Sequence, residues 1–292
     1  MGFRYRGYSR TELDNQYSPS TRTANMREIL TEYAVRSARA RAARPGHSQL
    51  RYGPEPREAL DLFAADQPDA PLLVFVHGGY WQELSKDESG FPAEGLSGAS
   101  YAAVGYGLAP EYQLSEIVGQ VRRGLWWLIA HAAELGFSPR RIHLAGHCAG
   151  ACLVAAALQT GWLPDGSHPA DVFSSAILLS GVYDLRPLQR TYVNDNVGLT
   201  PAQAAELSPL LHLPDRLPQL IVARGEAETD EFARQHDDLV RCAAPRASSV
   251  EEFVVAHRNH FDLPFDLDDP ATVLGSAVFR RLGLSREPLI RP

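Results

Sequence analysis

Cysteine is scarce in this chain, which has three in 292 residues, at positions 148, 152 and 242. Three cysteines do not suggest a disulfide framework, and Cys148 and Cys152 lack the two-pair spacing of a zinc site. We therefore expect a reducing, cytoplasmic location, no bound metal and no other cofactor. The apolar content of 45% is ordinary for a globular protein, and we expect residues 1–292 to form a single domain.

Long apolar runs and an excess of positive charge are also missing. No stretch approaches the length that crosses a bilayer, and the polar N-terminus lacks the apolar region of a signal peptide. The formal net charge of −7 gives no support for nucleic-acid binding, and the arginines of residues 36–41 are expected to form a solvated helix face. The expected partner is a small-molecule substrate with an aromatic or acyl group, not a nucleic acid or a membrane. A homodimer is left open.

A glycine-flanked turn joins two apolar segments in the middle of the chain. Residues 141–145 predict a buried strand and residues 151–158 a buried helix. Between them, Gly-His-Cys-Ala-Gly has the G-x-C-x-G spacing of a nucleophile elbow, with cysteine where serine is usual. A helix N-terminus favours a thiolate beside it, so Cys148 is the candidate nucleophile. The alternative is a turn with a buried structural cysteine.

A second glycine-containing turn follows another apolar segment. Residues 72–76 predict a buried strand that runs straight into His-Gly-Gly-Tyr-Trp at 77–81. Glycines after a strand let backbone N–H groups face an oxyanion, as in the loops of esterases and lipases. We expect the oxyanion hole to be formed by Gly78, Gly79, Tyr80 and Ala149. A tight turn that needs positive φ is the alternative.

Apolar segments and helical patterns alternate along most of the chain. An antiparallel pair at 49–52 and 59–63 precedes them. The expected strands are 72–76, 101–106, 141–145, 175–181, 219–223 and 250–255, and the expected helices are 113–135, 151–158, 232–242 and 270–282. This alternation predicts an α/β fold with a mostly parallel central sheet, right-handed crossovers and flanking helices.

Two polar regions interrupt the pattern. Residues 1–46 are expected to wrap the domain, with one helix around residues 26–33 that ends before Pro45 and Gly46. Residues 182–217 are expected to form a small helical cap over the carboxyl ends of the strands, where α/β folds bind ligands. A long connection without a role is the alternative. The side chains expected to line the substrate pocket are Trp81, His147 and Tyr183, and the alternative for Trp81 is that it covers the sheet edge.

An acid and a base should follow the last two strands, in the order nucleophile, acid, histidine. Glu228 is the first candidate for the acid and Asp230 the second, although acids that open a helix are often only partners of its dipole. His257 and His260 both follow the last strand, and the pattern alone does not separate them.

With these segments placed, the chain resembles the kynurenine formamidases (arylformamidases), α/β-hydrolases that release formate from N-formyl-L-kynurenine. The resemblance covers almost the whole chain and runs through NQYSPS (15–20), HGGYWQ (77–82), SKDES (85–89), YGLAP (106–110), SGVYDL (180–185) and NHFD (259–262). The family's histidine precedes Phe-Asp, which implies His260. Its acid lies just before a Glu-Phe pair, which implies Glu228, although the family usually has aspartate there.

The resemblance implies an α/β-hydrolase fold and a hydrolase for an aryl formamide such as N-formyl-L-kynurenine. Cys148, His260 and Glu228 would form its triad and pass through a covalent acyl-enzyme. Cysteine replaces the family's serine, either as a natural branch or as a replacement that traps an acyl intermediate. The dienelactone hydrolases also carry cysteine in such an elbow.

Two other functions are open at this point. A thiolate leaves a tetrahedral intermediate more readily than an arylamine does, so an acyltransferase or thioesterase of a specialised pathway is one alternative. A binding protein that has lost catalysis is the other, and the presence of all three triad residues argues against it.

Overall fold

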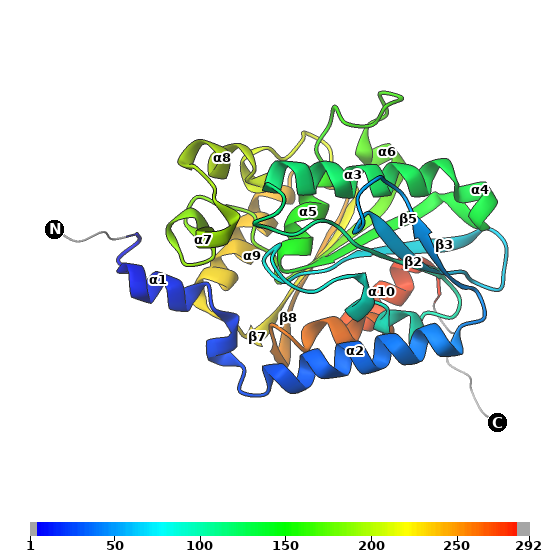
Figure 1. Cartoon of the computed structure of the whole chain (residues 1–292), viewed down its shortest axis with the longest axis horizontal. Helices are drawn as coiled ribbons and strands as arrows, with labels where there is room; N and C mark the ends of the chain where they lie inside the picture. Colours follow the sequence, from blue (N-terminus) through cyan, green and yellow to red (C-terminus); the bar gives the residue numbers. More distant parts are fainter. Residues whose placement is uncertain (1–4, 285–292) are drawn as a thin grey trace.

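A central eight-stranded sheet organises the chain in the computed structural model, which describes residues 5–284 (Figure 1). The strand order is β1-β2-β4-β3-β5-β6-β7-β8. Strand β2 is antiparallel to β1 and β4, and all other neighbours pair in parallel. The mostly parallel α/β architecture expected from the sequence is confirmed. The strands are β1 (His47–Arg51), β2 (Ala59–Phe63), β3 (Ala70–Val76), β4 (Ser100–Val104), β5 (Phe137–His147), β6 (Phe173–Leu179), β7 (Gln219–Ala227) and β8 (Val250–Asn259).

Helices cover both faces of this sheet. In Figure 1, α3 and α5 lie on one side of the strands, and α2 and α10 lie on the other. The α-helices are α1 (Arg10–Gln16), α2 (Met26–Ala43), α3 (Leu114–Ala130), α4 (Ala132–Leu135), α5 (Ala149–Ala157), α6 (Pro169–Val172), α7 (Asn194–Val197), α8 (Pro201–Glu206), α9 (Asp230–Ala243) and α10 (Val273–Leu282). Short 3-10 helices are η1 (Pro19–Arg22), η2 (Lys86–Glu88), η3 (Phe91–Glu94), η4 (Leu188–Arg190), η5 (Pro209–Leu211) and η6 (Leu263–Asp268).

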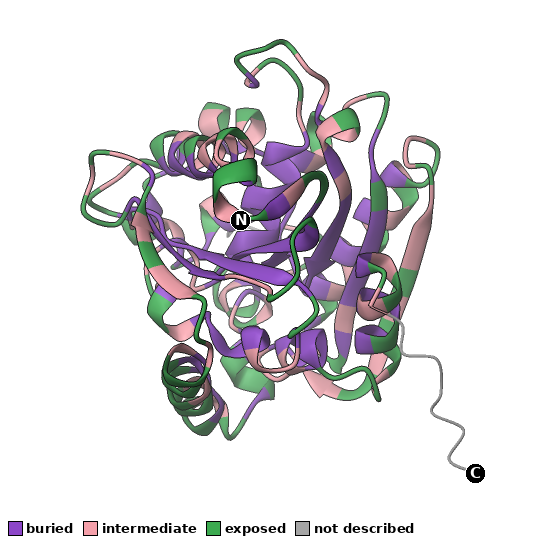
Figure 2. Cartoon of the chain, turned by 90° about the vertical axis from the view of Figure 1, so that its right-hand side faces the viewer, coloured by how far each residue is buried: buried purple, intermediate pink, exposed green. Residues whose placement is uncertain are grey.

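The apolar strands are buried on both faces because successive side chains point to opposite sides. On β3, Leu72 and Val74 belong to the core beneath α3, α5 and α9, whereas Leu73 and Phe75 belong to the core beneath α2 and α10. Figure 2 shows the middle of the sheet as a buried centre, with exposed residues on the outer helices, the loops and parts of the edge strands. Such two-sided burial explains why the strands appear in the sequence as continuous apolar runs.

The last two strands extend further than the sequence predicted. Strand β7 runs four residues past the expected end at Ala223, and β8 runs four residues past Val255. Their pairing continues through a register shift between Gly225 and Ala227, so that Ala227 lies opposite Asn259. This extension brings the residues that follow the two strands next to each other.

The N-terminal region and the cap are attached to this core by different contacts. Helix α1 was not predicted, although Ser9 and Glu12 form a capping box at its start. On α2, Arg36 is half-buried and pairs with Glu94 and Asp268, so it belongs to an ion-pair network instead of a solvated face. Residues 182–217 contain η4, α7, α8 and η5.

Within residues 5–284, no helix is both long enough and apolar enough to cross a membrane.

Candidate active site

Four polar side chains and one glycine-containing turn meet where parallel strands end. Cys148 follows β5, Ser180 follows β6, Glu228 follows β7 and His260 follows β8, while the HGGYW turn that begins at His77 follows β3. Parallel strands place their carboxyl ends at one edge of the sheet, which is where ligands bind in open α/β folds. The fold therefore gathers at this edge the nucleophile, acid and base candidates that the sequence separates by up to 112 positions (260 − 148).

Cys148 occupies a sharp turn between β5 and α5. Its backbone has φ 55° and ψ −119°, a strained conformation, and its N–H donates to Leu179 O at 2.9 Å. A Cβ on Gly150 would lie 2.0 Å from Val76 O, and one on Gly78 would lie 3.0 Å from Cys148 Cβ. Only glycine allows the elbow and the β3 turn to come this close. The sulfur-bearing residue is 4% exposed.

A chain of hydrogen bonds links Cys148 to a buried carboxylate. Glu228 Oε2 lies 3.0 Å from His260 Nδ1, and the side chain of Cys148 is hydrogen-bonded to the same imidazole, whose Nε2 remains for the sulfur. Two donors hold the other carboxylate oxygen: Ser180 Oγ at 2.6 Å and the Gly225 amide at 2.8 Å from Oε1. The Glu228 side chain is fully buried. This is the connectivity of a nucleophile, a base and an orienting acid.

The hydrogen-bonded groups of Cys148, His260 and Glu228 shift one another's pKa values. Burial alone would lower the pKa of His260, but the charge and hydrogen bond of Cys148, followed by those of Glu228, raise it to about 10. Burial would likewise raise the pKa of Glu228, but the hydrogen bond and charge of His260 and the Ser180 and Gly225 donors lower it. The geometry thus favours a protonated imidazole at His260 and an ionised carboxylate at Glu228.

The segment that carries His260 is itself tightly held. Asn259 Nδ2 donates to Asp262 Oδ2 at 2.6 Å, and the Asn259 amide donates to Asp262 Oδ1 at 2.7 Å, which closes the turn around the histidine. His147 Nε2 donates to the His260 carbonyl at 2.8 Å. Burial and the charge of His260 lower the pKa of His147 well below its usual range, so a neutral His147 holds the backbone of His260 in place.

Backbone amides are available next to the sulfur. Gly79 and Tyr80 have φ of 91° and 49°, and neither amide donates to another residue in the described part of the chain. The N–H of Ala149, the first residue of α5, has no intrahelical acceptor. The Tyr80 hydroxyl donates to Tyr17 O at 2.7 Å, which holds the turn in place. These three amides fit the expected oxyanion hole.

Gly78, the fourth residue expected in the oxyanion hole, is held in place through its carbonyl oxygen. The Gly78 carbonyl accepts from His77 Nδ1 at 2.9 Å and lies 3.3 Å from the Tyr106 hydroxyl, which also donates to His77 O at 2.8 Å. Burial lowers the pKa of His77 to about 4, and its ring stacks on Tyr106 with centroids 4.1 Å apart. The neutral histidine and the tyrosine therefore fix the turn from behind.

A cavity of about 240 Å³ opens above the sulfur. Its walls come mainly from the N-terminal region and the β3 turn, and Tyr192 lines it from the cap. The lining residues are Pro19, Ser20, Met26, Leu30, Tyr33, Gly79, Tyr80, Gln82, Glu83, Leu84, His147, Cys148, Tyr192, His260 and Phe261. The sequence analysis attributed the pocket to the cap and did not anticipate the contribution of residues 19–33. Apolar residues at helical spacing on α2 were the available signal.

Of the three side chains expected to line the pocket, the structure places only His147 there. Trp81 is fully buried and packs in the main core. Tyr183 is also buried, and its ring folds back over Gly181, where a Cβ would lie 2.3 Å from the tyrosine ring. Their aromatic character suggested a substrate contact, but both serve the core.

The two competing acid and base candidates lie elsewhere. Asp230 is exposed at the first turn of α9 and interacts with Tyr8. His257 is exposed and has φ 61°, and its backbone N–H donates to Glu226 Oε2 at 3.2 Å. Neither is among the residues that line the cavity.

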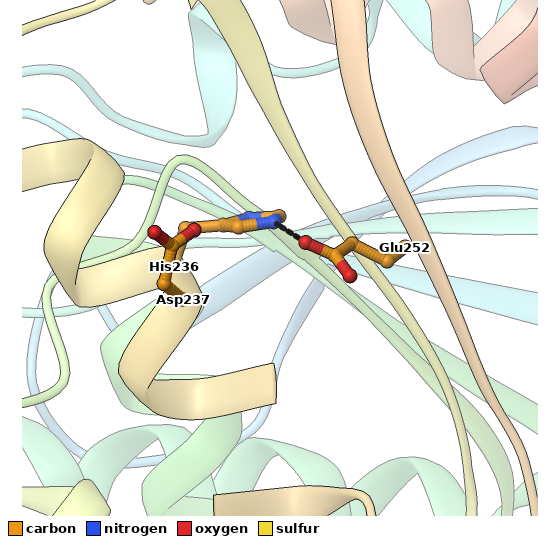
Figure 3. Close-up of side chains that lie close together, drawn as sticks. All are labelled: His236, Asp237 and Glu252. Carbon is orange, nitrogen blue, oxygen red and sulfur yellow. Dashed lines mark hydrogen bonds and ion pairs between the residues drawn. The ribbon is translucent and has the colours of Figure 1, made fainter. Parts of the chain in front are cut away.

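One group of potential metal ligands lies away from this cavity. In the described residues, His236, Asp237 and Glu252 place one ligand atom each within 4.8 Å of one another. Figure 3 shows the imidazole of His236 on α9 directed at the carboxylate of Glu252 on β8, and Nε2 lies 3.0 Å from Oε1. Asp237 and Glu252 are exposed. The short contact is a hydrogen bond between a helix and a strand that pack together.

Comparisons with known proteins agree with this geometry. Residues 73–225 match the model of a family with the alpha/beta hydrolase fold. A kynurenine formamidase from Danio rerio is 32% identical over 96% of this chain and 99% of its own length, and one from Drosophila melanogaster is 32% identical over 86% and 91%.

Solved structures extend the agreement to three dimensions. The chain resembles a protein assigned as a thioesterase from Silicibacter sp. TM1040, with a TM-score of 0.80 and 28% identity over 91% of this chain and 98% of that one. A thermostable carboxylesterase from a metagenomic library has the same fold, with a TM-score of 0.70 and 19% identity over 91% and 96%. The chain is thus a hydrolase of the esterase and formamidase type, and it belongs to the kynurenine formamidase family of α/β-hydrolases.

Proposed function

We propose that the protein hydrolyses an aryl formamide such as N-formyl-L-kynurenine, with Cys148 as nucleophile, His260 as acid and base, and Glu228 as the orienting acid. The family supports aryl-formamide hydrolysis. The observation that carries the finer proposal is the hydrogen-bonded chain from Cys148 through His260 to a fully buried Glu228, which lies beside two turns with free amides.

Acylation begins from the thiolate and imidazolium. Cys148 Sγ forms a bond to the formyl carbon, and the carbonyl electron pair moves onto oxygen. The amides of Gly79, Tyr80 and Ala149 receive this oxyanion, and one such donor is typically worth about 3 kcal/mol in the transition state. His260 Nε2–H gives its proton to the amide nitrogen, the C–N bond breaks, and the arylamine leaves.

Deacylation restores the starting state. The S-formyl enzyme holds a neutral His260, which takes a proton from water while the water oxygen attacks the formyl carbon. The C–S bond then breaks, and the sulfur leaves with its electron pair as thiolate beside the new imidazolium. Formic acid loses its proton to solvent as formate. Glu228 stays ionised throughout and holds Nδ1 of the imidazole.

A thioesterase is the second candidate, for a specific reason. The sulfur of Cys148 is a better leaving group than an arylamine, and a structural relative with 28% identity is assigned to that activity. In an acyl thioester both groups on the tetrahedral carbon are sulfurs, so the intermediate can collapse forward without prior protonation of an amine.

Mass spectrometry of the intact protein tests the proposal. The protein is mixed with N-formyl-L-kynurenine, or with an acyl thioester, and quenched during turnover. A mass gain of one formyl group with the formamide, together with release of formate and arylamine, is expected. Cys148→Ala should show neither, whereas Cys152→Ala, a buried cysteine one helical turn later, should retain both.

Acylation by the thioester alone would instead favour the second candidate. An adduct on neither substrate, with full activity in Cys148→Ala, would show that Cys148 is a structural thiol. We also propose a reducing location such as the cytoplasm, because all three cysteines are free thiols and this chemistry needs a reduced Cys148.

A further inference from the structure

The cavity above Cys148 has an unusual charge distribution. None of the residues that line it within the described chain is a lysine or an arginine. Its lining includes two histidines, of which His147 is neutral, and one carboxylate, that of Glu83. Beside His260, which lies between Cys148 and Glu228, Glu83 supplies the one carboxylate among the described residues of this lining. Glu83 also borders an adjoining cavity whose lining includes Arg51, Arg57 and Lys86, but none of these cations faces the cavity above Cys148.

The position of Glu83 is set by the oxyanion turn. Its backbone N–H donates to Gly79 O at 3.0 Å, and the neighbouring Gln82 N–H donates to the same oxygen at 2.9 Å. Glu83 is thus attached to the same turn that would hold the substrate oxyanion. The residue is exposed at the rim of the cavity, and its carboxylate makes no hydrogen bond or ion pair with any residue in 5–284.

The polar neighbours of Glu83 are already engaged. Gln82 Nε2 donates to Val193 O at 3.1 Å, and its Oε1 accepts from Asn196 Nδ2 at 2.9 Å, so this amide is used to hold the cap. Tyr192 lines the same cavity and lies close enough to interact electrostatically with both Cys148 and Glu83. Burial raises the pKa of its hydroxyl, and the charges of Cys148 and Glu83 both contribute to the rise.

An unpaired carboxylate at the rim of a cavity without cations attracts a positive group on the ligand and repels a negative one. The aromatic rings of Tyr80 and Tyr192, which line the same cavity, add a favourable surface for a cation. A ligand whose formyl group lies at the sulfur would direct the remainder of its leaving group toward this rim.

We propose that Glu83 is a specificity-determining residue that binds a primary ammonium group on the leaving-group part of the substrate. The cavity accordingly prefers acyl donors with an amine-bearing leaving group over neutral or anionic ones. This inference rests on the proposed function for its choice of aryl formamides, but the charge preference itself does not depend on that reaction.

A matched pair of substrates tests the preference. One is an ortho-acyl formanilide whose side chain ends in a primary ammonium, and the other carries a methyl group in place of the ammonium. We expect kcat/KM to favour the ammonium compound by about threefold to fivefold, mainly through KM, as for one ion pair that solvent partly screens. Glu83→Gln should reduce this ratio to about one, and Glu83→Asp should restore part of it. Glu111→Gln, an exposed glutamate outside the cavity, should leave the ratio unchanged.

Charged thiol reagents test the same residue without any turnover. An aminoethyl and a sulfonatoethyl methanethiosulfonate each form a mixed disulfide with Cys148 when the thiolate attacks the sulfenyl sulfur and methanesulfinate leaves. The cationic reagent should react faster, and Glu83→Gln should reduce the ratio of the two rates about fivefold, whereas Glu111→Gln should not.

The two experiments separate the two proposals. If the formamides are not hydrolysed but the reagent ratio depends on Glu83, the formamidase assignment fails and the ammonium site stands. If formamides are hydrolysed but both ratios are the same in Glu83→Gln and in the unsubstituted protein, the ammonium site is refuted and the formamidase assignment stands.

Discussion

Cys148→Ser is expected to reverse the direction in which activity changes with pH. Burial would lower the pKa of His260, and the charge and hydrogen bond of Cys148 are the largest of the effects that instead raise it to about 10. A rise from the ordinary 6.5 to about 10 corresponds to about 5 kcal/mol in favour of the imidazolium, at about 1.4 kcal/mol per tenfold change. A neutral serine hydroxyl keeps a hydrogen bond but removes the charge, so the pKa of His260 should fall.

The two forms should therefore have opposite pH profiles. In the proposed mechanism the imidazolium of the unsubstituted enzyme protonates the departing arylamine, so kcat/KM on an aryl formamide should stay level near neutral pH and fall as the pH rises through about 10. In Cys148→Ser the imidazole must be neutral to take the hydroxyl proton. Its kcat/KM should rise with pH and reach a plateau well below pH 10.

The size of the change depends on the substrate. An alkoxide leaves less readily than a thiolate, so the serine form's tetrahedral intermediate expels the amine more often. At its plateau it should match or exceed the cysteine form on the formamide. On an acyl thioester the leaving thiolate departs readily from either intermediate, so serine brings no gain there that offsets the misplacement of its attacking atom by the shorter C–O bond, and the rate should fall by about a hundredfold.

The assay is the release of arylamine, followed by absorbance between about pH 5 and about pH 11. Cys148→Ala supplies the blank, and Cys152→Ser controls for the loss of a buried cysteine on the same helix. If both forms rise with pH along the same curve, Cys148 does not hold the charge on His260, and the thiolate–imidazolium pair is wrong.

Three other comparisons test the neighbours of Cys148. His260→Ala should abolish the burst of nitrophenolate from a p-nitrophenyl ester, whereas the exposed His257→Ala should retain it; a loss confined to the latter would overturn the assignment. Glu228→Ala should lower kcat by about a hundredfold or more and Asp230→Ala very little, while equal mild effects would mean that neither residue orients His260. Ser180→Ala should lower kcat about tenfold at unchanged KM, because a charge-assisted hydrogen bond of about 1.5–3 kcal/mol to Glu228 is lost. Unchanged kcat would show that the backbone amide suffices.

The features that the sequence predicted well depend on local interactions. The glycines at 146 and 150, the apolar strand before them and the apolar helix after them are contiguous, so the elbow at Cys148 could be anticipated without the fold. The strands were predictable for the same reason, because two-sided burial makes each one a continuous apolar run. Their ends were less predictable. The four-residue extensions of β7 and β8 depend on pairing between distant segments past a register shift.

The features that the sequence could not provide arise from contacts between distant segments. Ser180 donates to Glu228 across 48 positions, and the only signal for it was a serine at the end of a central strand. Tyr17 accepts from Tyr80 and donates from its own hydroxyl to Glu231, which places residues 19–33 over the cavity. The sequence also does not reveal the direction of a side chain at a turn. For this reason Trp81 was expected in the pocket, whereas it lies in the core.

The two departures from the family pattern, cysteine at 148 and glutamate at 228, act on the same imidazole in the proposed mechanism. A thiolate nucleophile creates the difficulty that the intermediate can expel sulfur before the arylamine. The remedy is a proton delivered to nitrogen before collapse, and a histidine held as imidazolium already carries that proton. Glu228, kept ionised by Ser180, Gly225 and His260, preserves this charge from the other side of the ring. A serine nucleophile has no such requirement, because its histidine receives the proton only when the hydroxyl attacks. The carboxylate of Glu228 and the sulfur of Cys148 therefore act on His260 together, and a substitution of either residue should change the pKa of that histidine.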